Sequence, residues 1–250
     1  ANKLTIDKNG LHPDQPGFDV NNVEQYGFAI PWWRTFVQSL ILQWGSNLVS
    51  EDGSEVLVNQ DEALEAVQLA TDLIHKYRVA PKPQGFDAWH AFGAGKLAMC
   101  VDGSWVYNWF KGYPEIEPFM WPIPQFGPKR PAAIMWSHTL LMPSTLDSAK
   151  VDAVQELIKY ISDHSYIWTL DAGMPPARLS VSNTPELSDM WTVPLFIEQN
   201  STIGVMEFAH PNTLEILSYV EAEMSNVLNG IKTPKAGMDD AARRIQRILK

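Results

Sequence analysis

Short apolar runs alternate with segments of helical periodicity through the first 145 residues of the sequence. Apolar side chains from Phe36 to Trp44 recur at helical spacing, and Gly45 follows as a stop signal. A helix expected over residues 87–94 then leads into residues 97–101, which have the composition of a buried strand. This rhythm, followed by a helix-rich second part, predicts an α/β or α+β fold.

The expected helices share apolar side chains three and four residues apart, and they cover residues 33–44, 59–77, 87–94, 104–110, 147–162, 211–229 and 234–249. Asn59 is expected to cap the second of them and Pro211 to stand in the first turn of the sixth. The expected strands are short and apolar, and they fall at residues 26–30, twice within 47–58, and at 97–101, 119–123 and 132–141. The first 25 residues are polar and read as loop.

Charge and cysteine content exclude several classes of protein. The chain has 250 residues and a formal net charge of -10, so a nucleic-acid backbone would be repelled. Cys100 is the single cysteine, which excludes an intramolecular disulfide and a multi-cysteine metal site. No run approaches the roughly 18 apolar residues of a membrane span.

Three local motifs are better explained by ordinary structure than by a cofactor or metal. Gly93-Ala94-Gly95 fits a dinucleotide fingerprint, but here a helix precedes the glycines and a strand follows them, which is the reverse of the required order. Thr5, Asp7 and Asn9 form half of a calcium loop that lacks its final Glu. The six histidines show no metal-ligand spacing. We therefore expect no cofactor and no metal site.

Tryptophan is unusually abundant, with ten in the chain. Trp44, Trp109, Trp121, Trp168 and Trp191 are expected in the core, whereas Trp32, Trp33, Trp105 and Trp136 stand at loops or element ends. An indole face can stack on the C–H side of a sugar, while adjacent polar groups bond its hydroxyls. The polar neighbours available for that role are Asp102, Ser137 and His138.

Several stretches, read in order, resemble the sugar-type extracellular solute-binding proteins of ABC importers, the family that includes maltose-binding and glycerol-phosphate-binding proteins. They are LTIDKNG, YGFAIPWW, LILQWGSNLVSEDG, EALEAVQLATDLIHKY, AFGAGKLAMCVDGSWVYNWF, WPIPQFGPKRPAAIMWSHTLLMPS, AVQELIKYISD, DAGMPPARLSV and NGIKTPKAGMDDAARRIQRIL. The resemblance runs almost from end to end.

The resemblance implies a periplasmic-binding-protein-like fold of two α/β lobes that hold ligand in a cleft and close by a hinge. It assigns residues 1–135 and 200–250 to lobe II, and residues 136–199 to the crossover segment and a partial lobe I. It also implies that the sequence is a fragment lacking the N-terminal part of lobe I. Such a fragment would present apolar surface and invite self-association.

Site residues follow from the same resemblance. Trp105 matches an aromatic platform of lobe II, and Trp32 or Trp33 matches the aromatic at the start of the first lobe II helix. The segment 136–138 replaces the small residues common in relatives with Trp, Ser and His. Gly173 is expected to approach ligand through its backbone, and Arg178 either binds ligand or braces its loop.

The function implied is a non-catalytic receptor that binds a sugar or oligosaccharide outside the cytoplasm and delivers it to an ABC permease. The location expected is periplasmic or extracellular, with lipid anchoring of the parent left open. One alternative is a glycoside hydrolase that uses two carboxylates, such as Asp87 with Asp102 or Glu115 with Glu117. The other is a protein-interaction module that buries its tryptophans against a partner.

Overall fold

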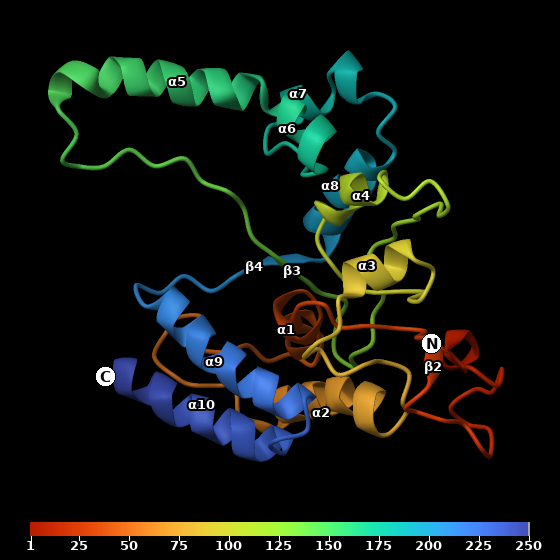
Figure 1. Cartoon of the computed structure of the whole chain (residues 1–250). Helices are drawn as coiled ribbons and strands as arrows, with labels where there is room; N and C mark the ends of the chain where they lie inside the picture. The colour runs from red at the N-terminus through yellow and green to blue at the C-terminus, as the bar shows by residue number, and fades with distance from the viewer. Residues whose placement is uncertain (250) are drawn as a thin grey trace. The chain divides into compact units, whose positions relative to one another are not determined.

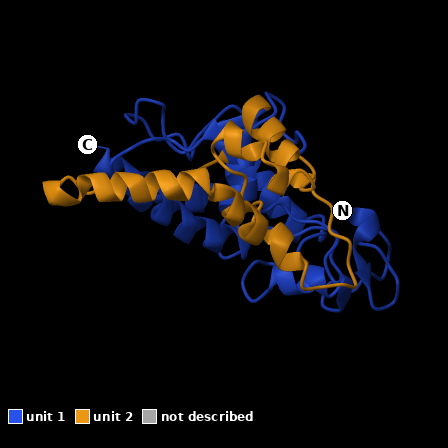
Figure 2. Cartoon of the chain, turned by 90° about the horizontal axis from the view of Figure 1, so that it is seen from above, with its two compact units in different colours: residues 1–102, 123–134, 203–250 blue, residues 103–122, 135–202 orange. Residues whose placement is uncertain are grey.

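The computed structural model describes residues 1–249, and the chain divides into two units (Figures 1 and 2). Unit 1 comprises Ala1–Asp102, Ile123–Ile134 and Ile203–Lys250, and unit 2 comprises Gly103–Pro122 and Met135–Thr202. The break points expected near residues 135 and 200 lie beside these boundaries. Residues 103–122, which the family resemblance places in lobe II, belong to unit 2, and the division into lobes stays a prediction.

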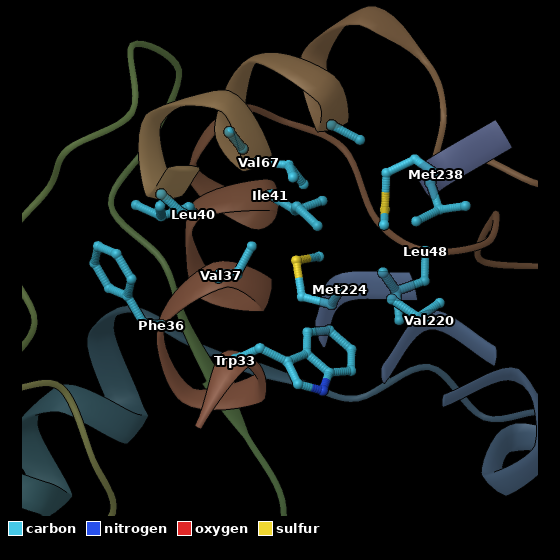
Figure 3. Packing of buried hydrophobic residues seen from close by; sticks show 14 of the residues in the cluster. Trp33, Phe36, Val37, Leu40, Ile41, Leu48, Val67, Val220, Met224 and Met238 are labelled. Carbon is cyan, nitrogen blue, oxygen red and sulfur yellow. The ribbon is translucent and has the colours of Figure 1, made fainter. Parts of the chain in front are cut away.

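Unit 1 is built on helices α1 (Trp33–Gln43), α2 (Asp61–His75), α9 (Thr213–Leu228) and α10 (Pro234–Ile248), with the short α3 (Ala88–Gly93) beside them. Helix α10 packs along α9, and both contact α2, which in turn contacts α1 (Figure 1). The apolar faces of α1, α2, α9 and α10 share one core, in which Phe36, Ile41 and Met224 have no exposed surface (Figure 3), whereas α3 packs in a separate, smaller cluster. The helical periodicity thus correctly predicts these five helices.

Two expected helix starts are wrong in detail. Helix α2 is capped by the backbone of Gln60, and the Asn59 amide instead donates to Asp239 Oδ1 over 2.9 Å. Helix α9 begins after Asn212, so Pro211 lies outside its first turn. At α10 the expected start is confirmed, because the Thr233 hydroxyl accepts from the Ala236 N–H and Pro234 is the first helical residue.

The strands are short. Strand β1 (Ile6–Asp7) pairs antiparallel with β2 (Val23–Gln25), and β3 (Ala133–Met135) pairs with β4 (Gly204–Met206). An isolated antiparallel β-bridge joins Val49 to Val56. Isolated parallel β-bridges join Tyr26 to Leu97 and Ala29 to Cys100. The strands expected at 26–30, 97–101 and within 47–58 are therefore reduced to isolated bridges.

The N-terminal segment is more ordered than its polar composition predicts. The buried Asp7 carboxylate accepts N–H groups of Asn9, Leu11 and Asp19 over 2.8 to 2.9 Å. The bond from Asp19, aided by the other two, outweighs burial and lowers the pKa of Asp7. The half calcium loop is thus a turn organised around one carboxylate, as interpreted from the sequence.

Of two further expected strands, one is absent and the other is shorter than expected. Residues 119–123 form no strand, because Pro118, Pro122 and Pro124 remove the backbone donors that a ladder needs. The strand expected over 132–141 is limited to β3, since its partner β4 offers only three residues.

Unit 2 contains α4 (Val106–Phe110), α5 (Val151–Asp163), α6 (Ser165–Ala172), α7 (Leu179–Ser182) and α8 (Thr192–Thr202). The described residues also form three 3₁₀ turns, at Asn2–Leu4 in unit 1 and at Ser148–Lys150 and Pro185–Leu187 in unit 2. Helix α4 packs on α6, where the Asn108 amide donates to the Leu170 carbonyl over 2.6 Å. This contact holds residues 103–122 within unit 2. None of the helices described is long and apolar enough to cross a membrane.

Candidate functional site

Two hollows adjoin at Pro31 in unit 1. The larger, of about 540 Å³, is lined by Pro31, Gly85, Phe86, Asp87, Ala88 and Trp89. The smaller, of about 150 Å³, is lined by Ile30, Pro31, Trp32, Trp33, Pro83, Glu221, Met224, Ser225 and Leu228. Three of the ten tryptophans thus lie at these hollows, together with two carboxylates. Indole faces beside a few polar groups are the usual lining of a small-molecule site.

Trp32 is fixed at the entrance of α1. Its backbone is extended and forms the N-cap of the helix, and its carbonyl accepts from the Thr35 hydroxyl over 2.8 Å. The Arg34 guanidinium lies 5.0 Å from the Trp32 ring centroid, within range of a cation–π contact. Arg34 is itself held by both Glu207 carboxylate oxygens at 2.8 Å. The half-buried indole is therefore oriented before any ligand arrives.

Trp33 is mostly a core residue. It is 5% exposed and packs at the end of the cluster around α1, where Met224 also lies (Figure 3). Its Nε1 is buried without a hydrogen-bond partner among residues 1–249. A buried donor left unpaired costs about 1–3 kcal/mol, so the packing of Trp33 in the core carries a cost of that order.

Trp89 belongs to the larger hollow, and the sequence argument missed it. Its position right after the start of α3 is the same element-end signal that singled out Trp32, and it was the one tryptophan not assigned to either class. Its Nε1 donates to Asp102 Oδ2 over 2.8 Å. Asp102, expected beside a bound ligand, thus orients a pocket-lining indole in this structure.

Asp87 is the N-cap residue of the same short helix, α3. Its carboxylate accepts the His90 N–H over 3.1 Å and lies 2.6 Å from His90 Nδ1. The backbone bond, followed by the contact with the ring, lowers the pKa of Asp87. Helix capping accounts for Asp87 and indole orientation for Asp102, so neither carboxylate requires a hydrolytic role.

In unit 2 the structure brings Trp105 and Gly173 together. Gly173 ends α6 with φ of +72°, and a Cβ placed there would lie 2.6 Å from the Ser104 carbonyl oxygen and 3.7 Å from Trp105 Cα. The half-buried Trp105 ring lies over Gly103, where a Cβ would meet it at 2.1 Å. Glycine at both positions permits this close approach of backbone and indole.

The remaining expected site residues also lie in unit 2. Arg178 pairs with Asp163, which is the bracing role considered for it. Trp136 is half-buried, while Ser137 and His138 are exposed. The His138 ring lies 5.6 Å from the ring of Trp168. The structure shows where these side chains lie, and their contact with ligand stays a prediction.

Three tryptophans expected in the core are exposed. Trp121, Trp168 and Trp191 are 74%, 48% and 38% exposed. All three belong to unit 2, which buries few large side chains, and Trp121 also lies in the proline-rich segment that forms no strand. Trp44, by contrast, packs against the unit 1 core, as predicted.

The glycine motif and the cysteine have structural explanations. Gly95 follows α3 with φ of +70°, and Leu97 then bridges to Tyr26, so the interpretation as a helix end before an extended segment is confirmed. Burial, and after it the charge of Asp102, raises the pKa of the Cys100 thiol to about 12. Residues 1–249 contain no cluster of three or more His, Cys, Asp or Glu placed to hold a metal ion.

Comparison with known proteins identifies relatives of this chain. Residues 15–194 match the model of a family described as bacterial extracellular solute-binding protein. An ABC transporter solute-binding protein of Thermotoga lettingae, bound with α-D-tagatose, is similar with 22% identity, a TM-score of 0.76, and coverage of 99% of this chain and 70% of that one. The maltose/maltodextrin-binding domain of Bdellovibrio bacteriovorus, bound to maltotriose, is similar with 17% identity and a TM-score of 0.78. The match covers 99% of this chain and 64% of that one.

A substrate-binding protein of Listeria monocytogenes in complex with cycloalternan is similar at 20% identity, with a TM-score of 0.70 and coverage of 90% of this chain and 59% of that one. The chain therefore spans roughly three fifths to seven tenths of the length of these structures. They share its periplasmic-binding-protein-like fold. Because the family model covers most of the sequence, this chain belongs to the family of bacterial extracellular solute-binding proteins.

Proposed function

We propose that this chain binds a sugar or oligosaccharide outside the cytoplasm and delivers it to the permease of an ABC importer. The observation that carries the proposal is the pair of hollows at Pro31, where Trp32, Trp33 and Trp89 adjoin polar groups. Indole faces would stack on the C–H side of the sugar, and neighbouring polar groups would bond its hydroxyls. Three relatives of the same fold are described as bound to tagatose, maltotriose and cycloalternan, which supports a saccharide ligand.

The proposal keeps the two-lobe organisation of the family. Lobe II would comprise residues 1–135 and 200–250, and residues 136–199 would form the crossover and part of lobe I. Trp105, with Gly173 behind it, would supply a second stacking platform. Arg178 and the segment 136–138 would supply polar contacts.

The test is a thermal-shift screen against D-tagatose, maltose, maltotriose and cycloalternan. A ligand that binds only the folded chain raises its melting temperature. At a ligand concentration of about one hundred times Kd, the free energy of unfolding increases by about 2.7 kcal/mol. Trp32→Ala and Trp105→Ala should each weaken binding by about 2 kcal/mol if stacking supplies the affinity. Trp44→Ala is the control, because Trp44 lines neither hollow and its Nε1 donates to Glu65.

The rival functions give different results in the same samples. Release of shorter sugars from maltotriose would favour a glycoside hydrolase. A stable oligomer without any sugar-induced shift would favour an interaction module. Retained affinity in Trp32→Ala would remove that indole from the site.

A further inference from the structure

Helix α1 carries a polar face that is almost entirely buried. Ten polar or charged residues are buried among residues 1–249, and four of them belong to this one helix. Three of the polar side chains follow one another at intervals of four and form one row, and two more form a second row beside it. We call these residues the polar face of α1, and they are Arg34, Thr35, Gln38, Ser39 and Gln43.

The chain passes between the two units at four places. The breaks follow Asp102, Pro122, Ile134 and Thr202. At each break, a side chain of the polar face bonds a unit 1 residue that lies within five positions of the break. These contacts lie inside unit 1, and together they tie all four unit 1 ends to a single helix.

Two hydroxyl groups hold the first and third ends. Thr35 Oγ1 lies 2.9 Å from the Val101 carbonyl oxygen and 2.8 Å from that of Trp32, so its one proton is shared between two acceptors. Ser39 Oγ accepts the Ile134 N–H over 3.0 Å and donates its own proton to the Thr35 carbonyl over 2.7 Å. Both hydroxyl groups thus join α1 to backbone groups of segments that leave unit 1.

An ion pair holds the last end. Arg34 Nη2 lies 2.8 Å from each carboxylate oxygen of Glu207, and Gln38 Nε2 donates to one of these oxygens over 3.4 Å. The side chains of Arg34 and Glu207 are 16% and 14% exposed. Salt therefore screens this pair less than an exposed one.

Gln43 holds the middle segment, 123–134, with its whole hydrogen-bonding capacity. Its Nε2 donates to the carbonyls of Pro124 and Ala132 over 3.1 and 3.0 Å, and its Oε1 accepts the N–H groups of Phe126 and Gly127 over 2.7 and 3.0 Å. An amide side chain has two N–H donors and two lone pairs, so all four are used. A Cβ at Gly127 would lie 2.6 Å from Gln43 atoms, so glycine permits this approach.

The backbone of the middle segment depends on these bonds. Residues 124–132, which the structure describes throughout, form no helix or strand that would pair their N–H and C=O groups. A hydrogen bond of this kind adds little net stability, but removing one partner leaves the other buried and unpaired, which is costly. Detaching the segment from α1 is therefore unfavourable while unit 1 stays folded.

We propose that the polar face of α1 confines the unfolding of unit 2 to unit 2. The four ends stay bonded to α1 when unit 2 opens, and Trp32, the N-cap of the same helix, stays in place with them. Unit 2 is expected to open first because it buries few large side chains. The inference does not depend on the identity of the ligand.

Native-state hydrogen exchange at increasing urea concentration tests the proposal, because urea promotes each opening in proportion to the surface it exposes. In the wild-type chain, the N–H groups of Phe126, Gly127 and Ile134 should exchange only through the opening that also releases α2 and α9. The N–H groups of α4 and α6 should exchange through a smaller opening with a weaker urea dependence. Exchange of the three N–H groups together with α4 and α6 would overturn the proposal.

Two variants test the side chains separately. Gln43→Met keeps the length of the side chain but removes its donors and acceptors. The Phe126 and Gly127 N–H groups should then exchange at least tenfold faster and acquire the urea dependence of α4 and α6. Ser39→Ala should do the same to the Ile134 N–H, since its acceptor is lost.

Met238→Ala is the control. Met238 has no exposed surface and lies on α10, which packs on α9 and α2, so this variant loosens the unit 1 core at a helix other than α1. The three N–H groups should accelerate together with those of α2 and keep the same urea dependence.

The urea dependence separates an anchor from an ordinary stabilising contact. If Gln43→Met and Ser39→Ala accelerate exchange but leave its urea dependence equal to that of α2, the bonds stabilise unit 1 only and the proposal is wrong. If Gln43→Met does not fold, the wild-type chain and Ser39→Ala decide between the same two outcomes.

Discussion

Helices α1 and α5 have comparable lengths, and apolar periodicity predicts both of them, but they differ in what they bury. Helix α1 in unit 1 buries ten of its 11 residues, whereas α5 in unit 2 buries none of its 13. Periodicity predicts that a segment becomes a helix, because the pattern is local. It does not predict burial, which requires a partner surface from elsewhere in the chain.

Ion pairs differ between the units in the same way. In unit 1 the buried Glu223 carboxylate accepts from Lys232 over 2.6 Å, and Lys232 also bonds Asp240 over 2.7 Å. In unit 2 the pair of Arg178 with Asp163 is open to solvent. Stability should therefore depend strongly on side chains of unit 1 and weakly on those of α5 and its neighbours.

The largest effect is expected for Phe36→Ala. Phe36 has no exposed surface and lies 5.0 Å from the ring of Phe28 and 5.6 Å from that of Phe126. The cavity and the lost burial should lower the free energy of unfolding by about 3–5 kcal/mol in urea denaturation. Leu157→Ala on α5 should change it by less than about 0.5 kcal/mol. Equal losses in both variants would break the comparison.

Lys232→Met should have the next largest effect. Removal of the cation leaves the buried Glu223 with only Arg244, at 3.8 Å, as a charge partner. Because Lys232 is 29% exposed and Arg244 remains, we expect a loss of about 2 kcal/mol, below the range for a fully buried pair. Arg178→Met in unit 2 should cost less than about 1 kcal/mol. A larger loss of stability in Arg178→Met would mean that the stability of unit 2 depends on this surface ion pair.

The acid dependence of the same variant sharpens the result. Burial raises the pKa of Glu223, but bonds from Lys232 and Asn226 outweigh it, so the pKa lies below the ordinary 4.5. A lowered pKa contributes stability above pH 4.5 that is lost as pH falls through the folded value. The difference between wild type and Lys232→Met should therefore be largest near neutral pH and shrink below about pH 4. A difference independent of pH would remove Glu223 from the explanation.

The sequence predicted the elements whose cause is local. The helices of unit 1, the cap at Thr233 and the helix end at Gly95 all follow from periodicity and turn chemistry. The strands were predicted less well, because a strand exists only where a second segment pairs with it. Residues 132–141 have suitable composition, but β4 provides pairing for only three of them.

The candidate site was predicted in part. Trp32 and Trp33 were found because they stand together at a helix entrance, and both line the small hollow. Trp89 carried the same signal, but its pairing with Asp102 is visible only in three dimensions. Glu221 had no signal, since it is one of many exposed acids and α9 brings it to the hollow from nearly 190 positions along the chain after Trp33.

A smaller effect is expected for Gly173→Ala. The residue has φ of +72°, and its new Cβ would meet the Ser104 carbonyl oxygen at 2.6 Å, so backbone strain and steric conflict act together. We expect a loss of about 1–2 kcal/mol confined to unit 2, measured by hydrogen exchange of α4 and α6. Gly95→Ala is the control, since φ is +70° there but a Cβ meets nothing within 4 Å. Equal losses would show that the contact with Ser104 contributes nothing.

The last prediction concerns the Cys100 thiol, which should hardly react with an alkylating reagent in the folded chain. Burial beside Asp102 raises the pKa of Cys100 to about 12, so only about one thiol in 10⁴ is ionised at pH 8. Iodoacetamide should thus label the native chain at least about a thousandfold more slowly than the urea-unfolded chain. Because Cys100 belongs to unit 1, labelling should begin only when that unit opens. Phe36→Ala should therefore advance labelling to lower urea, while Leu157→Ala should leave it unchanged. Labelling that began earlier in both variants would mean that α5 supports the unit 1 core after all.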